Sequence, residues 1–367
     1  MKSSTSRRLM VPGVAALALG FALTGCGAGN EGGSSSSSDS SLSGTLSGSG
    51  SSAQQTAMQS WRSAFQTKNS KVTVNYDPAG SGAGVEKFNG GGVDFAASDS
   101  PLNADAGEID AAKKRCGGDA IEVPDYISPI AVIYNLKGVD KLQLDPKTVA
   151  GIFEGKITTW DDAAIKADNP GVSLPSTKIT PVHRSDDSGT TDNFTDYLSQ
   201  AGGGAWTSPH SKTWPLKSGE AGAQSSGMVA AVTNAEGSIG YVDDSAAGSL
   251  SKASIKVGDA YVAPSADAAG KALAASPLDD SRPENDIAVK VDRTTTESGA
   301  YPLILASYLI ACPTYKDSGK ADAVKAFMAY IVSDDGQQAA AKAAGSAPLP
   351  SELAKKAQDA VDTIKAG

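Results

Sequence analysis

Short apolar runs typical of strands alternate along the chain with longer segments whose apolar residues recur at helical spacing. Valine alternates with polar residues at 72–76, and continuous apolar runs at 127–136 and 301–311 indicate buried strands. Helical spacing marks the segments 57–65 and 324–331. Because strands and helices alternate over most of the length, the pattern predicts an α/β protein.

Composition limits the classes of function. A chain of 367 residues fits about two domains, and 40% hydrophobic with 20% charged residues is ordinary for a globular protein. A formal net charge of −9 argues against a nucleic-acid partner. Only two histidines and three cysteines are present, so a His-rich or Cys-rich metal centre is not expected, and no cofactor is predicted.

The first 25 residues have the features of a signal peptide. Basic residues, including Arg7 and Arg8, precede an apolar run at 9–23, which is too short for a spanning helix. The ending Leu-Thr-Gly before Cys26 resembles a bacterial lipobox, which predicts lipidation of Cys26 and anchoring at the outer face of the cell membrane. A plain secretory signal and a twin-arginine signal are the alternatives. Residues 26–41 read as a flexible Gly/Ser tether.

The stretch 181–192, PVHRSDDSGTTD, carries the densest candidate chemistry. A guanidinium (Arg184), a carboxylate (Asp186) and a hydroxyl-and-glycine turn at 188–191 precede helical spacing at 194–198. A helix that begins in this turn would direct free N–H groups and the positive end of its dipole toward it, which suits a tetrahedral oxyanion. The alternative is a Ser/Thr N-cap beside a surface ion pair.

Three further segments have related patterns. The Gly-rich segment 46–53 is interpreted as a turn that feeds a helix, and 77–84 repeats the order strand, glycine turn, helix. The third, VDFAASDSP, ends a strand at Asp99, where ligands gather in open α/β sheets. The alternatives are the end of the Gly/Ser tether for 46–53 and an ordinary turn aspartate for Asp99.

These segments, taken in order, resemble the bacterial phosphate-binding protein family, the solute-capturing subunit of the phosphate ABC importer. The motifs are IFEGKITTWDDAAI, NPGVSLPSTKITPVHRSDDSGTT, FTDYL, VDFAASDSPL and GSIGYVD. The resemblance implies a type II periplasmic-binding-protein fold whose two α/β lobes close on one phosphate. Lobe one would comprise 42–128 plus 300–367 and lobe two 129–299, with the hinge crossed near Ser128 and Tyr301.

The resemblance also implies a ligand set. Its members would be Ser52, Ala53, Ser81, Asp99, Arg184, Ser188, Gly189 and Thr190, with Asp186 orienting the arginine. Ser52 and Ala53 stand where the family usually has Thr followed by Phe. The partners implied are a membrane permease and an ATPase, and we expect the protein to act as a monomer.

Asp99 is the residue expected to discriminate between anions. Phosphate retains a proton at neutral pH and can donate it to a buried carboxylate, whereas sulfate has none to donate. A site built to bond such a proton rejects an analogue lacking it by ~10⁴-fold or more. The alternatives are a binder of another oxyanion, such as sulfate or molybdate, and a secreted phosphatase with Ser188 or Ser81 as nucleophile. The phosphatase is disfavoured because histidines are few.

Two cysteines remain once Cys26 is assigned to lipidation. In an exported protein Cys116 and Cys312 are expected to form a disulfide, with two buried free thiols as the alternative. Of the two histidines, His183 is expected beside the site and His210 on the surface.

Overall fold

The computed structural model describes residues 42–367, which lie within one compact unit, Ser40–Gly367. The signal peptide, Cys26 and the tether predicted for 26–41 lie outside the described residues. None of the helices in residues 42–367 has both the length and the apolar character needed to cross a membrane.

A nine-stranded sheet runs through this unit and confirms the predicted α/β class. Its strand order is β2-β1-β3-β12-β4-β8-β6-β7, and β9 pairs with β4. Parallel pairs join β1 to β2 and β3, and β6 to β7 and β8, while β12 is antiparallel to β3 and β4. The strands are β1 Gly44–Gly50, β2 Val72–Asp77, β3 Phe95–Ser98, β4 Ile121–Asn135, β6 Thr180–Arg184, β7 Glu220–Gly222, β8 Ser238–Asp243, β9 Ser251–Lys252 and β12 Ile304–Ala311.

Strand β4 connects the two parts of the sheet. Residues 121–129 pair with β12, and residues 130–135 pair with β8. All but its last residue are buried, which explains its continuous apolar pattern. The strand begins at Ile121, six residues before the apolar run predicted from 127. The pattern missed these residues because Glu122 and Asp125 are charged, although both are fully buried within the strand.

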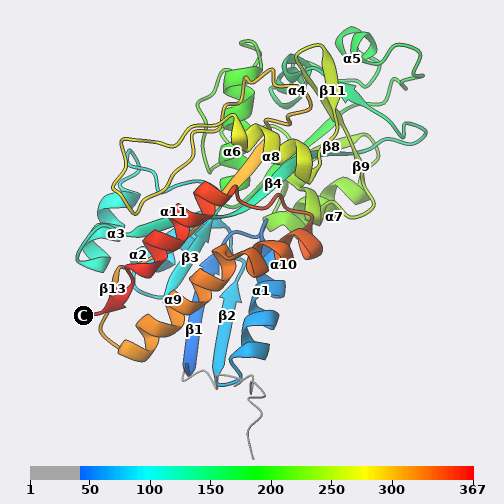
Figure 1. Ribbon diagram of the computed structural model, residues 1–367. Coiled ribbons are helices and arrows are strands. Elements are labelled where there is room, and N and C mark those ends of the chain that lie inside the picture. Colours follow the sequence, from blue (N-terminus) through cyan, green and yellow to red (C-terminus); the bar gives the residue numbers. More distant parts are fainter. Residues whose placement is uncertain (1–41) are drawn as a thin grey trace, which may run out of the picture. The chain divides into compact units, whose positions relative to one another are not determined.

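Helices cover the sheet, and Figure 1 shows α1, α9 and α10 beside β1 and β2, with α4, α6 and α8 around the far end of β4. Aromatic side chains bind the first group to the sheet: the Phe327 ring of α9 contacts Phe65 of α1 and Phe95 of β3. The helices are α1 Gln55–Lys68, α2 Ser81–Asn89, α3 Glu108–Cys116, α4 Pro146–Phe153, α5 Ala163–Asp168, α6 Gly189–Ala201, α7 Gln224–Asn234, α8 Ala266–Ala274, α9 Ser318–Val332, α10 Asp334–Ala344 and α11 Ser351–Asp362, with a short 3₁₀ turn at Asp244–Ala246.

The interpretation of residues 46–53 as a Gly-rich turn is wrong for most of that segment. Residues 44–50 form strand β1, and only the four residues after it turn into helix α1. The glycines permit close packing in the strand: a Cβ on Gly48 would overlap the Phe95 ring, and one on Gly50 would overlap the Ala97 backbone. Glycine therefore marks crowding between neighbouring strands here.

Two small sheets and one covalent link complete the unit. The small sheets join β5 Gln143–Leu144 with β10 Ser254–Val257 and β11 Ala260–Val262, and β13 Thr314–Tyr315 with β14 Lys365–Ala366. Cys116, at the end of α3, and Cys312, just after β12, form a disulfide with their Cα atoms 5.1 Å apart. The predicted pairing is confirmed.

Candidate functional site

Three helices begin where strands end, and their first turns meet. Helix α1 follows β1, α2 follows β2 and α6 follows β6. The first N–H groups of a helix lack acceptors within it, so each start offers amides and the positive end of a dipole. All eight predicted ligand residues lie at these starts or on the strand ends beside them.

Asp99 follows β3 and is 2% exposed. Its carboxylate accepts hydrogen bonds from four hydroxyl groups: Ser81 at 3.3 Å and Thr190 at 3.2 Å reach Oδ2, while Ser307 at 2.9 Å and Ser51 reach Oδ1. Burial raises the pKa of Asp99 above its ordinary value, although the bonds from Ser51 and Ser307, the Arg184 charge and the bond from Thr190 oppose the shift. The hydroxyls thus stabilise an ionised carboxylate in a site that otherwise disfavours it.

Arg184 is the last residue of β6 and is 3% exposed. Its Nε and one terminal nitrogen bind the two oxygens of Asp186 at 2.8 and 2.5 Å, and the same terminal nitrogen donates to Ser52 Oγ at 3.3 Å. Although burial raises the pKa of Asp186, the hydrogen bond and charge of Arg184 outweigh it and lower that pKa overall. Asp186 therefore orients the guanidinium as an ionised partner.

Ser188 is the N-cap of α6, as the alternative interpretation of this stretch has it, but the neighbouring Arg184–Asp186 pair is not a surface pair, because Arg184 is buried. The Ser188 hydroxyl accepts the Thr191 amide at 3.3 Å, while the Ser188 amide itself donates to the Lys212 carbonyl at 2.9 Å. A Cβ on Gly189 would lie 2.8 Å from both Asp99 Cβ and Ser81 Oγ, so only glycine lets this helix approach Asp99 so closely. The Ser188 amide is already bonded within the chain in this structure.

The start of α1 is held by a serine that the sequence interpretation missed. Ser51 Oγ accepts the Ala53 amide at 3.1 Å and the Gln54 amide at 3.3 Å. The Ala53 amide, a predicted ligand, is thus bonded within the chain in this structure. Ser52 Oγ accepts the Ser225 amide at 3.2 Å and lies 3.1 Å from the Ser225 hydroxyl.

The side-chain hydrogen bonds form two neighbouring sets. Ser81 and Thr190 bond Asp99, while Ser52 bonds Arg184. Ser188 takes part through its cap.

Three polar residues at the edge of these sets were not predicted: Ser51, Ser225 and Ser307. Ser51 lies three residues before Gln54, the residue that precedes α1, so a capping hydroxyl could have been expected there. Ser225 and Ser307 carry no local signal, because each reaches the site through distant pairing.

The two histidines lie near the site without entering it. His183 stacks on Trp214, with ring centroids 5.1 Å apart, and its Nδ1 contacts the Arg184 carbonyl oxygen at 2.9 Å. His210 is half-exposed and pairs with Asp192 at 2.7 Å. Within residues 42–367 neither imidazole bonds Ser81 or Ser188, so neither serine has a histidine base.

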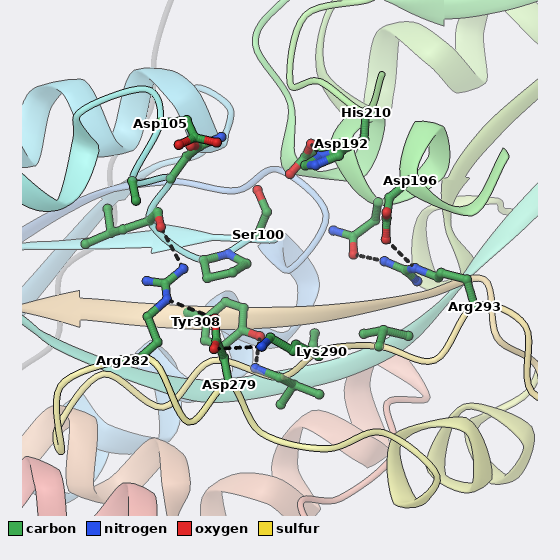
Figure 2. Close-up of a pocket in the computed structure, with 18 of the residues that line it drawn as sticks. Ser100, Asp105, Asp192, Asp196, His210, Asp279, Arg282, Lys290, Arg293 and Tyr308 are labelled. Carbon is green, nitrogen blue, oxygen red and sulfur yellow. Dashed lines mark hydrogen bonds and ion pairs between the residues drawn. The ribbon is translucent and has the colours of Figure 1, made fainter. Parts of the chain in front are cut away.

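A separate cavity of about 600 Å³ lies between residues 100–105, helix α6 and residues 279–293, and it is lined by none of the predicted ligands (Figure 2). Ser100 lies on its wall, and Lys290 and Arg282 point to Asp279. Every positive side chain that lines it is paired with a carboxylate: Lys290 and Arg282 with Asp279, Arg293 with Asp196 and His210 with Asp192. Four carboxylates (Asp105, Asp192, Asp196 and Asp279) line it against three Lys or Arg side chains, so an oxyanion is better served by the Arg184–Asp99 region, where helix starts meet.

Comparisons with known proteins agree with this geometry. Residues 35–335 match the family model described as a PBP superfamily domain. Over 313 residues the chain is 39% identical to phosphate-binding protein PstS 3 of Mycobacterium tuberculosis. The matched residues make up 84% of this chain and 83% of that protein.

Two solved structures have similar folds. The first is the high affinity periplasmic phosphate-binding protein PfluDING bound with phosphate (TM-score 0.71, 22% identity, 86% of this chain and 93% of that one). The second is a putative phosphate ABC transporter substrate-binding protein with bound phosphate from Clostridium perfringens (TM-score 0.59, 20% identity, 82% and 98%). The fold and the convergent helix starts define a two-lobed α/β solute-binding protein of the PBP superfamily. Within that class, the chain belongs to the PstS phosphate-binding protein family.

Proposed function

We propose that this protein captures inorganic phosphate between two lobes and delivers it to an ABC-type importer. The observation that carries the proposal is a buried carboxylate, Asp99, in the same region as a buried guanidinium, Arg184, and the starts of three helices. Guanidinium and amides attract an oxyanion. The carboxylate accepts a hydrogen bond only from an anion that still carries a proton, and phosphate is such an anion.

The proposed roles follow from bonding capacity. Arg184 supplies the bidentate positive charge, and Asp186 orients it. Ser52, Ser81 and Thr190 offer hydroxyl donors, Gly189 offers a helix-start amide, and Ser188 provides the cap that orders it. Ala53, whose amide donates to Ser51 Oγ, forms the turn before α1 beside the anion. Ser52 Oγ already accepts the Arg184 and Ser225 N–H groups, so its own proton is directed to the Ser225 hydroxyl or to a bound oxygen.

The proposed lobes comprise 42–128 plus 300–367 and 129–299. Their support is the division of β4, which pairs with β12 up to residue 129 and with β8 from residue 130. Contacts across this boundary include an ion pair between Lys212 Nζ and Glu108 at 2.7 Å and a hydrogen bond from the Gly82 amide to the Asp187 carbonyl. Closure around phosphate would form these contacts, and a permease would distinguish the closed form.

We further propose that the protein is exported, that Cys26 is lipidated and anchors it at the outer face of the cell membrane, and that it acts as a monomer with a permease and an ATPase. The lipobox-like sequence before Cys26 supports the anchor. The relative from Clostridium perfringens, described as an ABC transporter substrate-binding protein, supports the transport partners. The proposed activity is binding without catalysis, in keeping with relatives that are described as binding proteins.

Calorimetric titration tests the proposal. The protein beginning at residue 27, which contains the whole compact unit, is stripped of phosphate and titrated with phosphate and then with sulfate. We expect one-to-one phosphate binding that excess sulfate does not displace. Absence of phosphate binding by folded, ligand-free protein would refute the function.

Asp99→Asn is the decisive variant. Its amide can donate to an anion, so the preference for phosphate over sulfate is expected to fall by roughly 100-fold or more, because the discriminating acceptor is gone. Unchanged selectivity in a folded Asp99→Asn variant would remove Asp99 from the selectivity mechanism while leaving phosphate binding intact.

A further inference from the structure

The four hydroxyls on Asp99 separate into two pairs. Oδ2 accepts from Ser81 and Thr190, both predicted phosphate ligands, over 3.2–3.3 Å. Oδ1 accepts from Ser51 and Ser307, which are outside the predicted ligand set. A carboxylate has about four lone-pair positions, so in this structure all are occupied.

The proton of Ser51 has a single destination. Ser51 Oγ accepts the amides of Ala53 and Gln54, which occupy its two lone pairs. Its O–H is then available only for donation, and the neighbouring acceptor is Asp99 Oδ1. Because Ser51 is fully buried, water does not compete for this bond.

Ser307 reaches the same oxygen through sheet pairing. Tyr308 of β12 pairs antiparallel with Ser98 of β3, so Ser307 lies opposite Asp99. Its hydroxyl donates to Oδ1 at 2.9 Å, and the residue is fully buried. The pairing of β12 with β4 shifts register here: Ser307 pairs with Tyr126 and Tyr308 with Pro124, which leaves Asp125 of β4 as the extra residue. Bulges of this kind commonly redirect a side chain next to a functional site.

We propose that Ser51 and Ser307 are positioning residues for anion selectivity: they hold Oδ1 of Asp99 as an acceptor and leave Oδ2 alone to receive the phosphate proton. This inference rests on the proposed phosphate-binding function. Ser81 and Thr190 are the partners that can turn their hydroxyls from Oδ2 to the anion, since both are proposed ligands of it. Ser51 and Ser307 stay in place and keep the carboxylate oriented.

The electrostatic surroundings give the two serines a second effect. Arg184 favours ionised Asp99, burial opposes it, and the neighbouring Asp125 and Tyr76 add no compensating positive charge. The bonds from Ser51 and Ser307 are the largest contributions that lower the pKa of Asp99. Without one of them the carboxyl gains a proton more readily, and a protonated carboxyl donates a hydrogen bond that sulfate can accept.

The test is the selectivity of Ser307→Ala as a function of pH. Phosphate and sulfate are titrated separately into stripped protein beginning at residue 27, between pH 5.5 and 8. We expect the Kd for sulfate divided by the Kd for phosphate to fall by roughly 10- to 100-fold, which corresponds to the free energy of one hydrogen bond to a charged group. The fall should be larger at pH 5.5, because protonation of Asp99 then adds to the loss of orientation.

Ser100→Ala is the matched control. Ser100 is adjacent to Asp99 and 4% exposed, but its Oγ has no hydrogen-bond partner among the described residues. This variant is expected to keep the wild-type ratio at every pH. If Ser307→Ala does not fold, Ser307→Cys fills similar space with a weak donor and should shift the ratio in the same direction.

The outcomes separate this inference from the function on which it rests. A wild-type protein that does not bind phosphate contradicts the proposed function itself. Wild-type phosphate selectivity that survives in Ser307→Ala, or an equal, pH-independent loss of both affinities, overturns the positioning role. In the second case Ser307 supports only the packing of the sheet.

Discussion

Four carboxyl groups are fully or almost fully buried on or beside the central strands: Asp99, Glu122, Asp125 and Asp243. Burial raises the pKa of each. Asp99 has four hydroxyl partners, whereas neither oxygen of Asp125 has a hydrogen-bond partner within residues 42–367. At the scale of single residues, the sheet thus contains acids that are costly to ionise, and Asp99 differs from Asp125 in having hydroxyl donors that oppose the effect of burial.

The burial of Asp243 makes the stability of the protein depend on pH. Burial raises its pKa to about 7, against hydrogen bonds from serine and tyrosine hydroxyls that lower it. An unfolded aspartate ionises near ~3.9, so between that pH and about 7 the folded state binds more protons. Its contribution to stability is therefore present at low pH and is lost as pH rises toward 7.

We expect Asp243→Asn to reduce the loss of stability that accompanies a rise in pH. Between pH 5 and 8 the free energy of unfolding of the variant should fall by roughly 2–3 kcal/mol less than that of wild type, as the linkage relation requires for a shift of this size. Urea denaturation in phosphate-free buffer measures it. Asp259→Asn, at an exposed position, is the control and should retain the wild-type slope. An unchanged slope in Asp243→Asn would show that other groups cause the decline.

A fourth helix, α7, also contributes its first turn to the site. Among the described residues, Gln224 alone is a non-glycine residue with positive φ, at 58°. This backbone conformation directs the Gln224 amide to Asp186 Oδ1 at 2.9 Å, while the next amide, of Ser225, donates to Ser52. A strained residue at the start of this helix thus helps to fix both Asp186 and Ser52, the partners of Arg184.

Substitutions at Gln224 test that strain. Gln224→Gly adopts φ of 58° without a Cβ penalty and keeps the N–H, so stability should change by less than about 1 kcal/mol and phosphate affinity should be retained. Gln224→Val should destabilise by about 2 kcal/mol, because a β-branched residue tolerates positive φ poorly. Urea denaturation and calorimetry give the two quantities. Equal effects of Gly and Val would argue against backbone strain at this position.

At the scale of the whole unit, a disulfide joins segments that are distant in sequence. The Cys116–Cys312 disulfide links positions 196 residues apart, and both cysteines fall in the proposed lobe 42–128 plus 300–367. The bridge therefore restrains the unfolded chain strongly but does not span the proposed hinge.

Replacing both cysteines by serine should lower the free energy of unfolding by about 5 kcal/mol in the chain-entropy model for a loop of this length. Phosphate affinity of the folded variant should remain within a few-fold of wild type, since closure does not stretch the bridge. Denaturation of oxidised wild type, reduced wild type and the double variant, followed by phosphate titration, provides the comparison. A large loss of affinity with unchanged stability would instead place the bridge in the closing motion.

Local patterns in the sequence were enough to determine much of this protein. The α/β class, strands such as β2 and β8 and the helix that begins at 189 follow from spacing and residue type, because capping and alternation act over a few residues. That Arg184 and Asp99 belong to one site followed from the resemblance to the phosphate-binding family, because local spacing does not relate residues so far apart in sequence. The disulfide followed from there being one available pair outside Cys26.

Other features were decided only by tertiary structure. Residues 44–50 form a strand because β2 and β3 pair with its two edges. A glycine-rich sequence by itself does not predict such pairing. Ser307 meets Asp99 across 208 residues of sequence, and Ser225 meets Ser52 across 173. Local spacing does not indicate which strands lie side by side. The bond from Ser307 to Asp99 therefore depends on the pairing of β12 with β3.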